Sequence, residues 1–169
     1  MRPEVETILK QWLKKSIIKP SQSEWASQMV IIRKKTGDLR ICVDYRQLNR
    51  KTIKEAFPIP RIEESIEALG GARMFCCLDF NQAYLQMPLH KDDAHKTVFR
   101  AAGNLYAFTR LPFGLCNAPA SFSQFMNMYF GDINYKYIII YLDDVLAHSK
   151  TVSEMLERLE IVFERIKVH

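Results

Sequence analysis

The sequence lacks a long apolar run: none approaches the ~20 consecutive residues that a membrane helix needs, so we expect no transmembrane segment. The first residues mix acids with lysines and lack an apolar core, so no secretory signal peptide is expected. Only 6 glycines occur in 169 residues, and they form no glycine-rich phosphate loop. This argues against a nucleotide-hydrolysing motor. Internal repeats and low-complexity tracts are also missing.

Cysteine is scarce as well. The four cysteines are Cys42, Cys76, Cys77 and Cys116. Neighbouring residues of a strand point to opposite faces, so Cys76 and Cys77 cannot easily bridge each other or share a metal. We therefore predict that the four cysteines are reduced, that they are buried packing residues, and that the protein is intracellular.

The charge is unevenly distributed. Residues 1–54 hold 13 Lys and Arg against 5 Asp and Glu, a net of +8, and residues 55–169 hold 11 against 14, a net of −3, which gives the total of +5. Such asymmetry can arise by chance in a soluble domain. It also fits a basic front lobe that faces a polyanion and an acidic rear lobe that holds cations, which is the interpretation we favour.

Hydrophobic periodicity predicts the secondary structure. Helices are expected at 3–15, 61–69, 117–129 and from 151 to near the C-terminus, and hairpins at 26–33 with 39–45 and at 97–100 with 105–109 across Gly103-Asn104. Thr151 and Glu154 form a capping box at the start of the last helix. The residues expected on the buried faces of the last three of these helices are Ile62, Ile66, Leu69, Phe122, Phe125, Met126, Tyr129, Met155, Leu156, Leu159, Val162, Phe163 and Ile166.

Residues 137–148 read as two short apolar strands, and the turn between them carries Asp143 and Asp144. These acids alone could simply favour a surface turn. A third acid, Asp79, ends another apolar run at 74–80. Like charges at the ends of buried strands repel unless a cation lies between them. Hard divalent ions such as Mg²⁺ prefer oxygen ligands, so the three acids predict a two-metal site for phosphoryl transfer.

Residues from about 17 to 167 resemble the fingers and palm of a retroelement reverse transcriptase, closest to the long-terminal-repeat Ty3/gypsy kind. Each motif is weak alone, but their order and gaps together are specific. The motifs are Trp25-Ala26-Ser27, residues 40–49 (RICVDYRQLN), 78–84 (LDFNQAY), 111–119 (LPFGLCNAP) and 141–144 (YLDD).

The resemblance implies an α+β fold: a polymerase palm, with an antiparallel sheet backed by helices, and a fingers subdomain. Residues 1–56 would be fingers, and 57–169 would be palm with a fingers insertion near 88–112 and the start of the thumb connection at the end. A full thumb, a connection domain and a ribonuclease H domain would not fit within 169 residues.

The resemblance also implies a metal site. Asp79, Asp143 and Asp144 match the catalytic carboxylates that bind two Mg²⁺ ions, for which Mn²⁺ can substitute. The backbone carbonyl of Phe80 would help to hold the nucleotide-side metal. Tyr141 would lie near the primer end.

Four further positions match nucleotide-binding residues of the family. Lys34 and Arg40 resemble fingertip cations that contact the incoming triphosphate, and Tyr84 resembles the gate that excludes a 2′-hydroxyl. Phe113 stands at a position that contacts the nucleotide's sugar and that holds Gln in many retroviral relatives; its ring lacks the hydrogen-bonding groups of that Gln. Trp25 is better suited to packing, or to lining the path of the template, than to a catalytic role.

The expected function is RNA-directed DNA polymerase activity, with a primed RNA or DNA template and dNTPs as partners. A catalytically inactive nucleic-acid-binding remnant is the alternative, although all three acid positions are filled. A nuclease that uses the same two-metal chemistry is a third possible function, but the sequence matches no nuclease motif. We expect an intracellular location, in the cytoplasm, a retroelement particle or the nucleus, and no membrane partner; the oligomeric state is left open.

Overall fold

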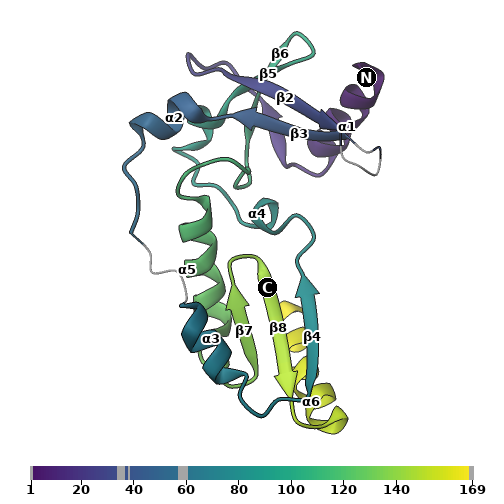
Figure 1. Ribbon diagram of the computed structural model, residues 1–169. Helices are drawn as coiled ribbons and strands as arrows, with labels where there is room; N and C mark the ends of the chain where they lie inside the picture. Colours follow the sequence, from purple (N-terminus) through teal and green to yellow (C-terminus); the bar gives the residue numbers. More distant parts are fainter. Residues whose placement is uncertain (1, 34–36, 38, 57–60, 168–169) are drawn as a thin grey trace. The chain divides into compact units, whose positions relative to one another are not determined.

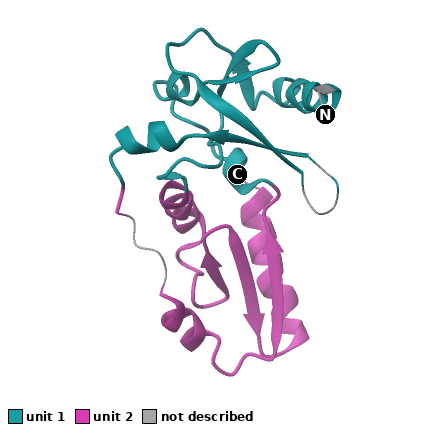
Figure 2. Cartoon of the chain, turned by 45° about the horizontal axis from the view of Figure 1, so that its top comes forward, with its two compact units in different colours: residues 1–54, 82–118 teal, residues 55–81, 119–169 magenta. Residues whose placement is uncertain are grey.

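The computed structural model describes residues 2–33, 37, 39–56 and 61–167. The chain forms two compact units (Figure 2): unit 1 comprises residues 1–54 and 82–118, and unit 2 comprises residues 55–81 and 119–169. The chain thus passes from unit 1 to unit 2, returns at residue 82, and enters unit 2 again at residue 119. The division into fingers and palm stays a prediction for these units.

Unit 1 is built on a five-stranded sheet with the order β1-β6-β5-β2-β3 (Figure 1). Its strands are β1 (Ile18–Pro20), β2 (Ser27–Arg33), β3 (Leu39–Asp44), β5 (Phe99–Ala101) and β6 (Asn104–Phe108). Its helical elements are α1 (Arg2–Lys14), α2 (Arg46–Lys51), α4 (Ala83–Gln86) and the short 3₁₀ helix η1 (Ala94–Thr97). Neighbouring strands pair antiparallel, except β2 and β5, which are parallel.

The core of unit 1 is formed by α1 and the sheet. Helical spacing places Val5 and Leu9 on one face of α1, and both side chains are buried in this core. The ring of Phe99, which is fully buried, lies 5.1 Å from that of Phe108. Tyr45 follows β3, and its hydroxyl donates a 2.9 Å hydrogen bond to the Thr97 carbonyl. Burial raises the pKa of Tyr45 above its ordinary value, so the phenol stays neutral and holds the end of β3 in place.

Both predicted hairpins of unit 1 are present. Strands β2 and β3 pair from Gln28↔Asp44 to Arg33↔Leu39. Strands β5 and β6 are joined by Ala102 and Gly103, which have φ of +48° and +81°. Two positive φ values are typical of a tight hairpin turn that matches the twist of its strands. The turn therefore lies one residue earlier than predicted. The helices α2 and α4 were not predicted, because each is too short to show helical periodicity.

Unit 2 contains a three-stranded antiparallel sheet with the order β4-β8-β7. The strands are β4 (Met74–Asp79), β7 (Ile138–Tyr141) and β8 (Asp144–Ser149), and the helices are α3 (Ile62–Ala68), α5 (Ala118–Phe130) and α6 (Val152–Lys167). Helices α5 and α6 lie behind the sheet in Figure 1. Ile138, Val145 and Ala147 are buried. The predicted antiparallel sheet backed by helices is confirmed. Among helices in the described parts of the chain, none combines the length and apolar composition needed to span a bilayer.

The ends of α6 are fixed by polar contacts. Thr151 Oγ1 accepts a hydrogen bond from the Glu154 backbone N–H at 3.3 Å, and the Glu154 carboxylate accepts one from the Lys150 N–H at 2.8 Å. This bond lowers the pKa of Glu154 and confirms the predicted capping box. Near the other end, Arg165 Nη2 lies 2.7 Å from Asp132 Oδ2, which ties α6 to the segment after α5.

Two predictions of burial are wrong in unit 2. On α6, Met155 and Val162 are buried, but Leu156 and Phe163 are 64% and 45% exposed. Apolar residues occupy two adjacent stripes of this helix, and the sheet covers only one of them. On α3, Ile62 and Ile66 are exposed for the same reason: periodicity defines an apolar stripe, whereas burial also requires a facing surface.

The cysteines also depart from the prediction. All four are free, as expected for reduced thiols. Cys42, Cys76 and Cys116 are half-buried rather than buried, and Cys77 is exposed. Every residue of β4 is exposed or half-buried, so neither face of this strand is fully covered, and Cys77 lies on the more open one.

The buried histidine of β8 leads to a prediction about pH. His148 is 6% exposed, and its Nε2 has no hydrogen-bond partner among the described residues. Burial, and then the nearby Arg158 guanidinium, lower the pKa of His148 below its ordinary value. Because the pKa of His148 is lower in the folded chain, the unfolded chain takes up its proton at a higher pH, so the stability linked to neutral His148 is present above the unfolded value of about 6.5 and is lost as the pH decreases. We expect a lower urea midpoint at pH 5.5 than at pH 7.5.

The variant His148→Phe should reduce this pH dependence, because it removes the titrating group and keeps a ring of similar size. His90→Gln is the matched control, since His90 is exposed, and it should retain the wild-type difference. Urea unfolding followed by circular dichroism at both pH values measures the effect. Equal pH differences in His148→Phe and the wild type would contradict the assignment.

Candidate functional site

The turn between β7 and β8 carries the adjacent acids. The strands are joined by two residues, Leu142 and Asp143, and Leu142 has φ of +56°. A side chain larger than glycine in this left-handed region costs about 1–3 kcal/mol and persists only where the surrounding structure holds it. Here the β7–β8 pairing, which continues to Tyr141↔Asp144, supplies that restraint. The turn is therefore a strained, fixed feature with Asp143 at its tip.

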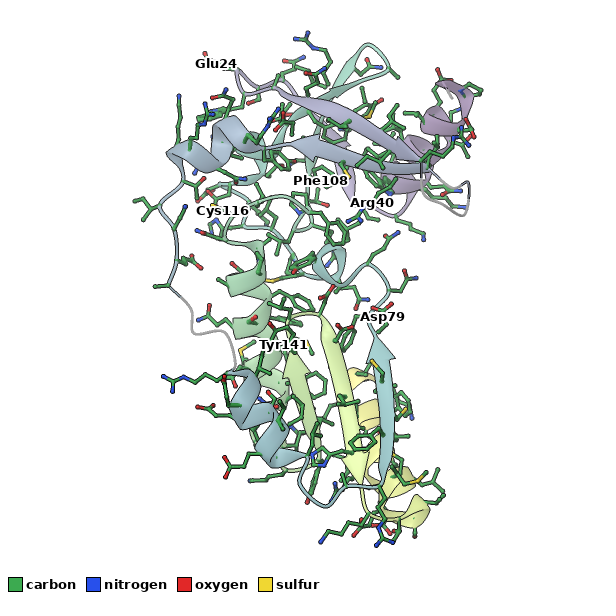
Figure 3. The ribbon with its side chains drawn as sticks, viewed as in Figure 1. Glu24, Arg40, Asp79, Phe108, Cys116 and Tyr141 are labelled. Carbon is green, nitrogen blue, oxygen red and sulfur yellow. The ribbon has the colours of Figure 1, made fainter. Side chains whose placement is uncertain are left out.

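Three side chains form a row across the sheet at this end. Asp144, on the central strand, is the cross-strand partner of Tyr141 on β7 and of Asp79 on β4. Direct cross-strand partners project from the same face, with their Cβ atoms about 4.5–5.5 Å apart. Figure 3 shows Asp79 and Tyr141 at the ends of their strands. We refer to these three side chains, the carboxylates of Asp144 and Asp79 with Tyr141 beside them, as the carboxylate row.

The carboxylate row is suited to a cation. Asp79 and Asp144 are exposed, and Asp143 is half-buried beside them in sequence. Like charges in direct cross-strand positions repel, and a divalent ion removes that repulsion. The donors are hard oxygens, the type that Mg²⁺ prefers. Within the described residues, no three Asp, Glu, His or Cys side chains form a ready metal cluster, so the row brings together two of the three predicted acids.

Phe80 directly follows β4 and is half-buried, so its backbone lies next to Asp79 in the chain. Tyr141 is 39% exposed at the end of β7. Both residues therefore belong to the same end of the unit 2 sheet as the acids. Their roles toward metal and primer stay predictions.

A second group of predicted residues meets in unit 1. The Arg40 guanidinium carbon lies 5.3 Å from the centroid of the Phe113 ring, within the range of a cation–π contact. The rings of Phe113 and Tyr84 make a T-shaped contact, with centroids 5.0 Å apart and planes at 80°. These three residues, which come from β3, a loop and α4, form the Arg40 aromatic cluster. Lys34, its predicted companion, lies outside the described residues.

Local structure determines where Tyr84 and Phe113 stand. Helix α4 begins after Gln82, whose φ is +53°, and it buries Ala83 and Leu85 while Tyr84 remains half-buried. After Phe113, the chain turns at Gly114 with φ of +95°, a conformation that favours glycine.

Asn49 is a residue of this site that the sequence analysis missed. Its side-chain amide donates to the Gly114 carbonyl at 2.8 Å, and its side-chain oxygen accepts from the Cys116 N–H at 2.9 Å. Both bonds join α2 to the turn that carries Phe113. The only available signal was the position of Asn49 within the 40–49 motif, because its partners lie far away in sequence.

Trp25 makes a different cation–π contact, with Lys51. It is 36% exposed, and Lys51 Nζ lies 5.5 Å from its ring centroid. An exposed indole with a lysine on its face is a surface on which a nucleotide base can stack. The exposed ring of Trp25 is compatible with the predicted place on the template path, which stays a prediction.

Comparison with known sequences places this chain in a family. The profile described as "Reverse transcriptase (RNA-dependent DNA polymerase)" matches residues 32–169. The match covers most of the chain, which therefore belongs to the reverse transcriptase family.

The chain is similar to retroelement proteins in particular. It is 33% identical over 159 residues to the Transposon Tf2-3 polyprotein of Schizosaccharomyces pombe, and the alignment covers 94% of this chain and 12% of the polyprotein. This finding confirms the predicted resemblance to a Ty3/gypsy-type retroelement.

Solved structures agree with the fold. The native prototype foamy virus protease-reverse transcriptase matches with a TM-score of 0.84 and 26% identity, over 97% of this chain and 22% of that one. A foamy viral protease-reverse transcriptase in complex with double-stranded DNA matches with a TM-score of 0.80 and 27% identity, over 98% and 28%. The predicted α+β polymerase fold is confirmed. The chain spans about a quarter of these proteins and about an eighth of the Tf2 polyprotein.

Proposed function

We propose that this chain catalyses template-directed DNA synthesis, in which a nucleotide from a dNTP is transferred to a primer 3′ hydroxyl on an RNA or DNA template. The carboxylate row carries the proposal, because it places Asp79 and Asp144 on one face of the unit 2 sheet. Membership of the reverse transcriptase family supports the reaction type. The foamy viral neighbour that binds double-stranded DNA supports a duplex as partner.

Asp79, Asp143 and Asp144 would hold the metal ions, together with the carbonyl of Phe80. When bound, two Mg²⁺ ions, for which Mn²⁺ can substitute, would supply charge neutralisation to the attacking and leaving oxygens. The fixed turn at Leu142 holds Asp144 opposite Asp79 across the sheet, with Asp143 directly before Asp144 in the chain, so two of the three acids stand in place before the reaction. Phosphoryl transfer depends mostly on such positioning and neutralisation.

The residues of unit 1 would handle the nucleotide and template. Arg40 would neutralise the triphosphate, with Lys34 as its companion, and Tyr84 would form a wall against a 2′-hydroxyl. Phe113 would present an apolar ring near the sugar. Trp25 would line the template path. The four free cysteines suit an intracellular setting: the cytoplasm, a retroelement particle or the nucleus.

Primer extension tests the proposal directly. The 169-residue protein is incubated with Mg²⁺, dNTPs and a primed RNA or DNA template, and products are resolved by length. We expect extension on both templates. A protein that binds the primed templates but adds no nucleotide would instead be the inactive remnant, and the polymerase proposal would be rejected.

We also expect duplex binding to be weak and sensitive to salt. The basic residues 1–54, with a net charge of +8, supply phosphate contacts. Affinity from such contacts falls with log salt, with a slope of about −0.9 per neutralised phosphate on DNA. Fluorescence anisotropy across a salt series measures that slope, and a trap-limited assay should show one or a few additions per encounter.

A fusion of this chain to a second duplex-binding domain should give longer products, because linked contacts raise affinity by about a hundredfold or more. Its acid chemistry should be unchanged. Long products from the 169-residue chain in the presence of trap would contradict this expectation, since this chain would then hold the duplex unaided.

A further inference from the structure

Phe113 stands at the centre of the Arg40 aromatic cluster. The Arg40 guanidinium carbon lies 5.3 Å from its ring centroid, and the Tyr84 ring contacts the same ring at 5.0 Å. The Phe113 ring therefore contacts both the guanidinium and the second aromatic ring of the cluster.

The backbone around Phe113 is well suited to hold its ring still. Pro112, just before it, is among the most deeply buried side chains, and Gly114, just after it, adopts φ of +95°. The Gly114 carbonyl accepts a hydrogen bond from the Asn49 amide at 2.8 Å. A built Cβ on Gly114 would lie 3.5 Å from the Val43 carbonyl oxygen, so the turn packs closely on β3, the strand that carries Arg40. Both partners of the cation–π contact are thus fixed to one framework.

A flexible arginine on a strand surface loses conformational freedom when it binds an anion, and that loss weakens binding. An aromatic face attracts a guanidinium and reduces the number of its conformations beforehand. A phenylalanine offers this face without a hydrogen-bonding group of its own. The Phe113 ring therefore limits the orientations of the Arg40 guanidinium before an anion binds.

We infer that Phe113 is a positioning residue that holds the Arg40 guanidinium ready for the triphosphate of the incoming nucleotide, and that Tyr84 braces the Phe113 ring. The inference rests on the proposed function in assigning the triphosphate to Arg40. It adds that the ring acts through Arg40, in addition to any contact with the sugar. Removing the aromatic face should weaken triphosphate binding only while Arg40 is present.

A double-mutant cycle with inorganic tripolyphosphate tests the inference without requiring catalysis. Tripolyphosphate has no sugar, so a direct contact between Phe113 and a sugar cannot contribute. Isothermal titration compares the 169-residue wild type with Phe113→Leu, Arg40→Gln and the double variant. We expect Phe113→Leu to weaken binding about two- to fivefold, the range of an exposed cation–π contact. In the Arg40→Gln background, the same change should have no further effect.

Two variants guard against a structural explanation. Phe113→Tyr keeps the aromatic face and should retain wild-type affinity, whereas Phe113→Met provides a second side chain without a ring should Phe113→Leu fold poorly. Tyr137→Leu is the matched control, because it removes the cation–π partner of Arg158, at 5.2 Å, in unit 2. It should leave tripolyphosphate binding unchanged. Urea unfolding of each variant confirms that it is folded.

Primer extension gives a second readout. Phe113→Leu should raise the KM for dNTP and leave kcat nearly unchanged, since it alters the binding of the ground state. The inference is overturned if Phe113→Leu binds tripolyphosphate like the wild type, if its effect persists without Arg40, or if the wild type does not bind tripolyphosphate. If the wild type extends primers but the effects of the Phe113 and Arg40 variants on tripolyphosphate binding are additive, this inference alone is rejected. If those effects are non-additive but the wild type does not extend primers, only the proposed polymerase function is rejected.

Discussion

The substitution Asp144→Asn is expected to reduce primer extension to below about one hundredth of the wild-type rate. Even partners that only orient a metal ligand are worth 10- to 100-fold, so loss of a ligand should cost at least as much. Asp144 is the residue that the sheet places directly opposite Asp79. Rates measured by quenched extension with saturating Mg²⁺ check the effect. Asp143→Asn should behave similarly, because it removes another of the predicted ligands.

The same substitution should make the metal-free protein more stable. Like charges in cross-strand positions destabilise a sheet by up to about 1 kcal/mol, and Asn relieves that repulsion. Mg²⁺ should then raise the melting temperature of the wild type more than that of Asp144→Asn, since binding to the folded state stabilises it by mass action.

Glu160→Gln on α6 is the matched control for Asp144→Asn. It removes one exposed acid of unit 2 by the same isosteric change, outside the carboxylate row. We expect wild-type extension and an unchanged response to Mg²⁺. Near-normal extension by Asp144→Asn would show that this acid is not a metal ligand.

The substitution Tyr84→Ala should reduce discrimination against ribonucleotides by roughly ten- to a hundredfold, the range over which an apolar pocket can reject an added hydroxyl. The half-buried Tyr84 ring is held by the T-shaped contact with Phe113, so it can act as a fixed wall. The measurement is the ratio of kcat/KM for dNTP and rNTP on the same primed template.

Tyr84→Phe separates the ring from the hydroxyl. It keeps the wall and the aromatic contact, and it should retain most of the wild-type discrimination. If Tyr84→Ala extended primers and still discriminated like the wild type, Tyr84 would be a packing residue of unit 1 and not a sugar gate.

Much of the local structure could be predicted from the sequence. The first helix, the β2–β3 hairpin and the capped last helix were expected near their observed bounds. Each has a strong local signal: an apolar stripe of helical period, strict alternation, or the Thr151–Glu154 capping box. The short helices α2 and α4 escaped prediction because fewer than two turns leave no period to detect.

Burial was less predictable. The apolar stripes of α3 and α6 were visible in the sequence, yet Ile66 and Leu156 are both 64% exposed. A stripe is a property of one helix, whereas burial depends on a second surface contributed by distant residues. The cysteines were misjudged for the same reason, since a sequence does not show how much of each segment the rest of the fold covers.

The sequence by itself determined the family and the candidate acids, because reverse transcriptase motifs are short, ordered runs whose chemistry lies in the residues themselves. Tertiary structure alone decided how those residues meet. Strand register set Asp144 between Tyr141 and Asp79. The packing of a glycine turn, fastened by Asn49, set the Phe113 ring against Arg40. Apart from the Tyr141–Asp144 pair, these contacts join segments far apart in the chain, and each depends on the core of its own unit, which no local pattern encodes.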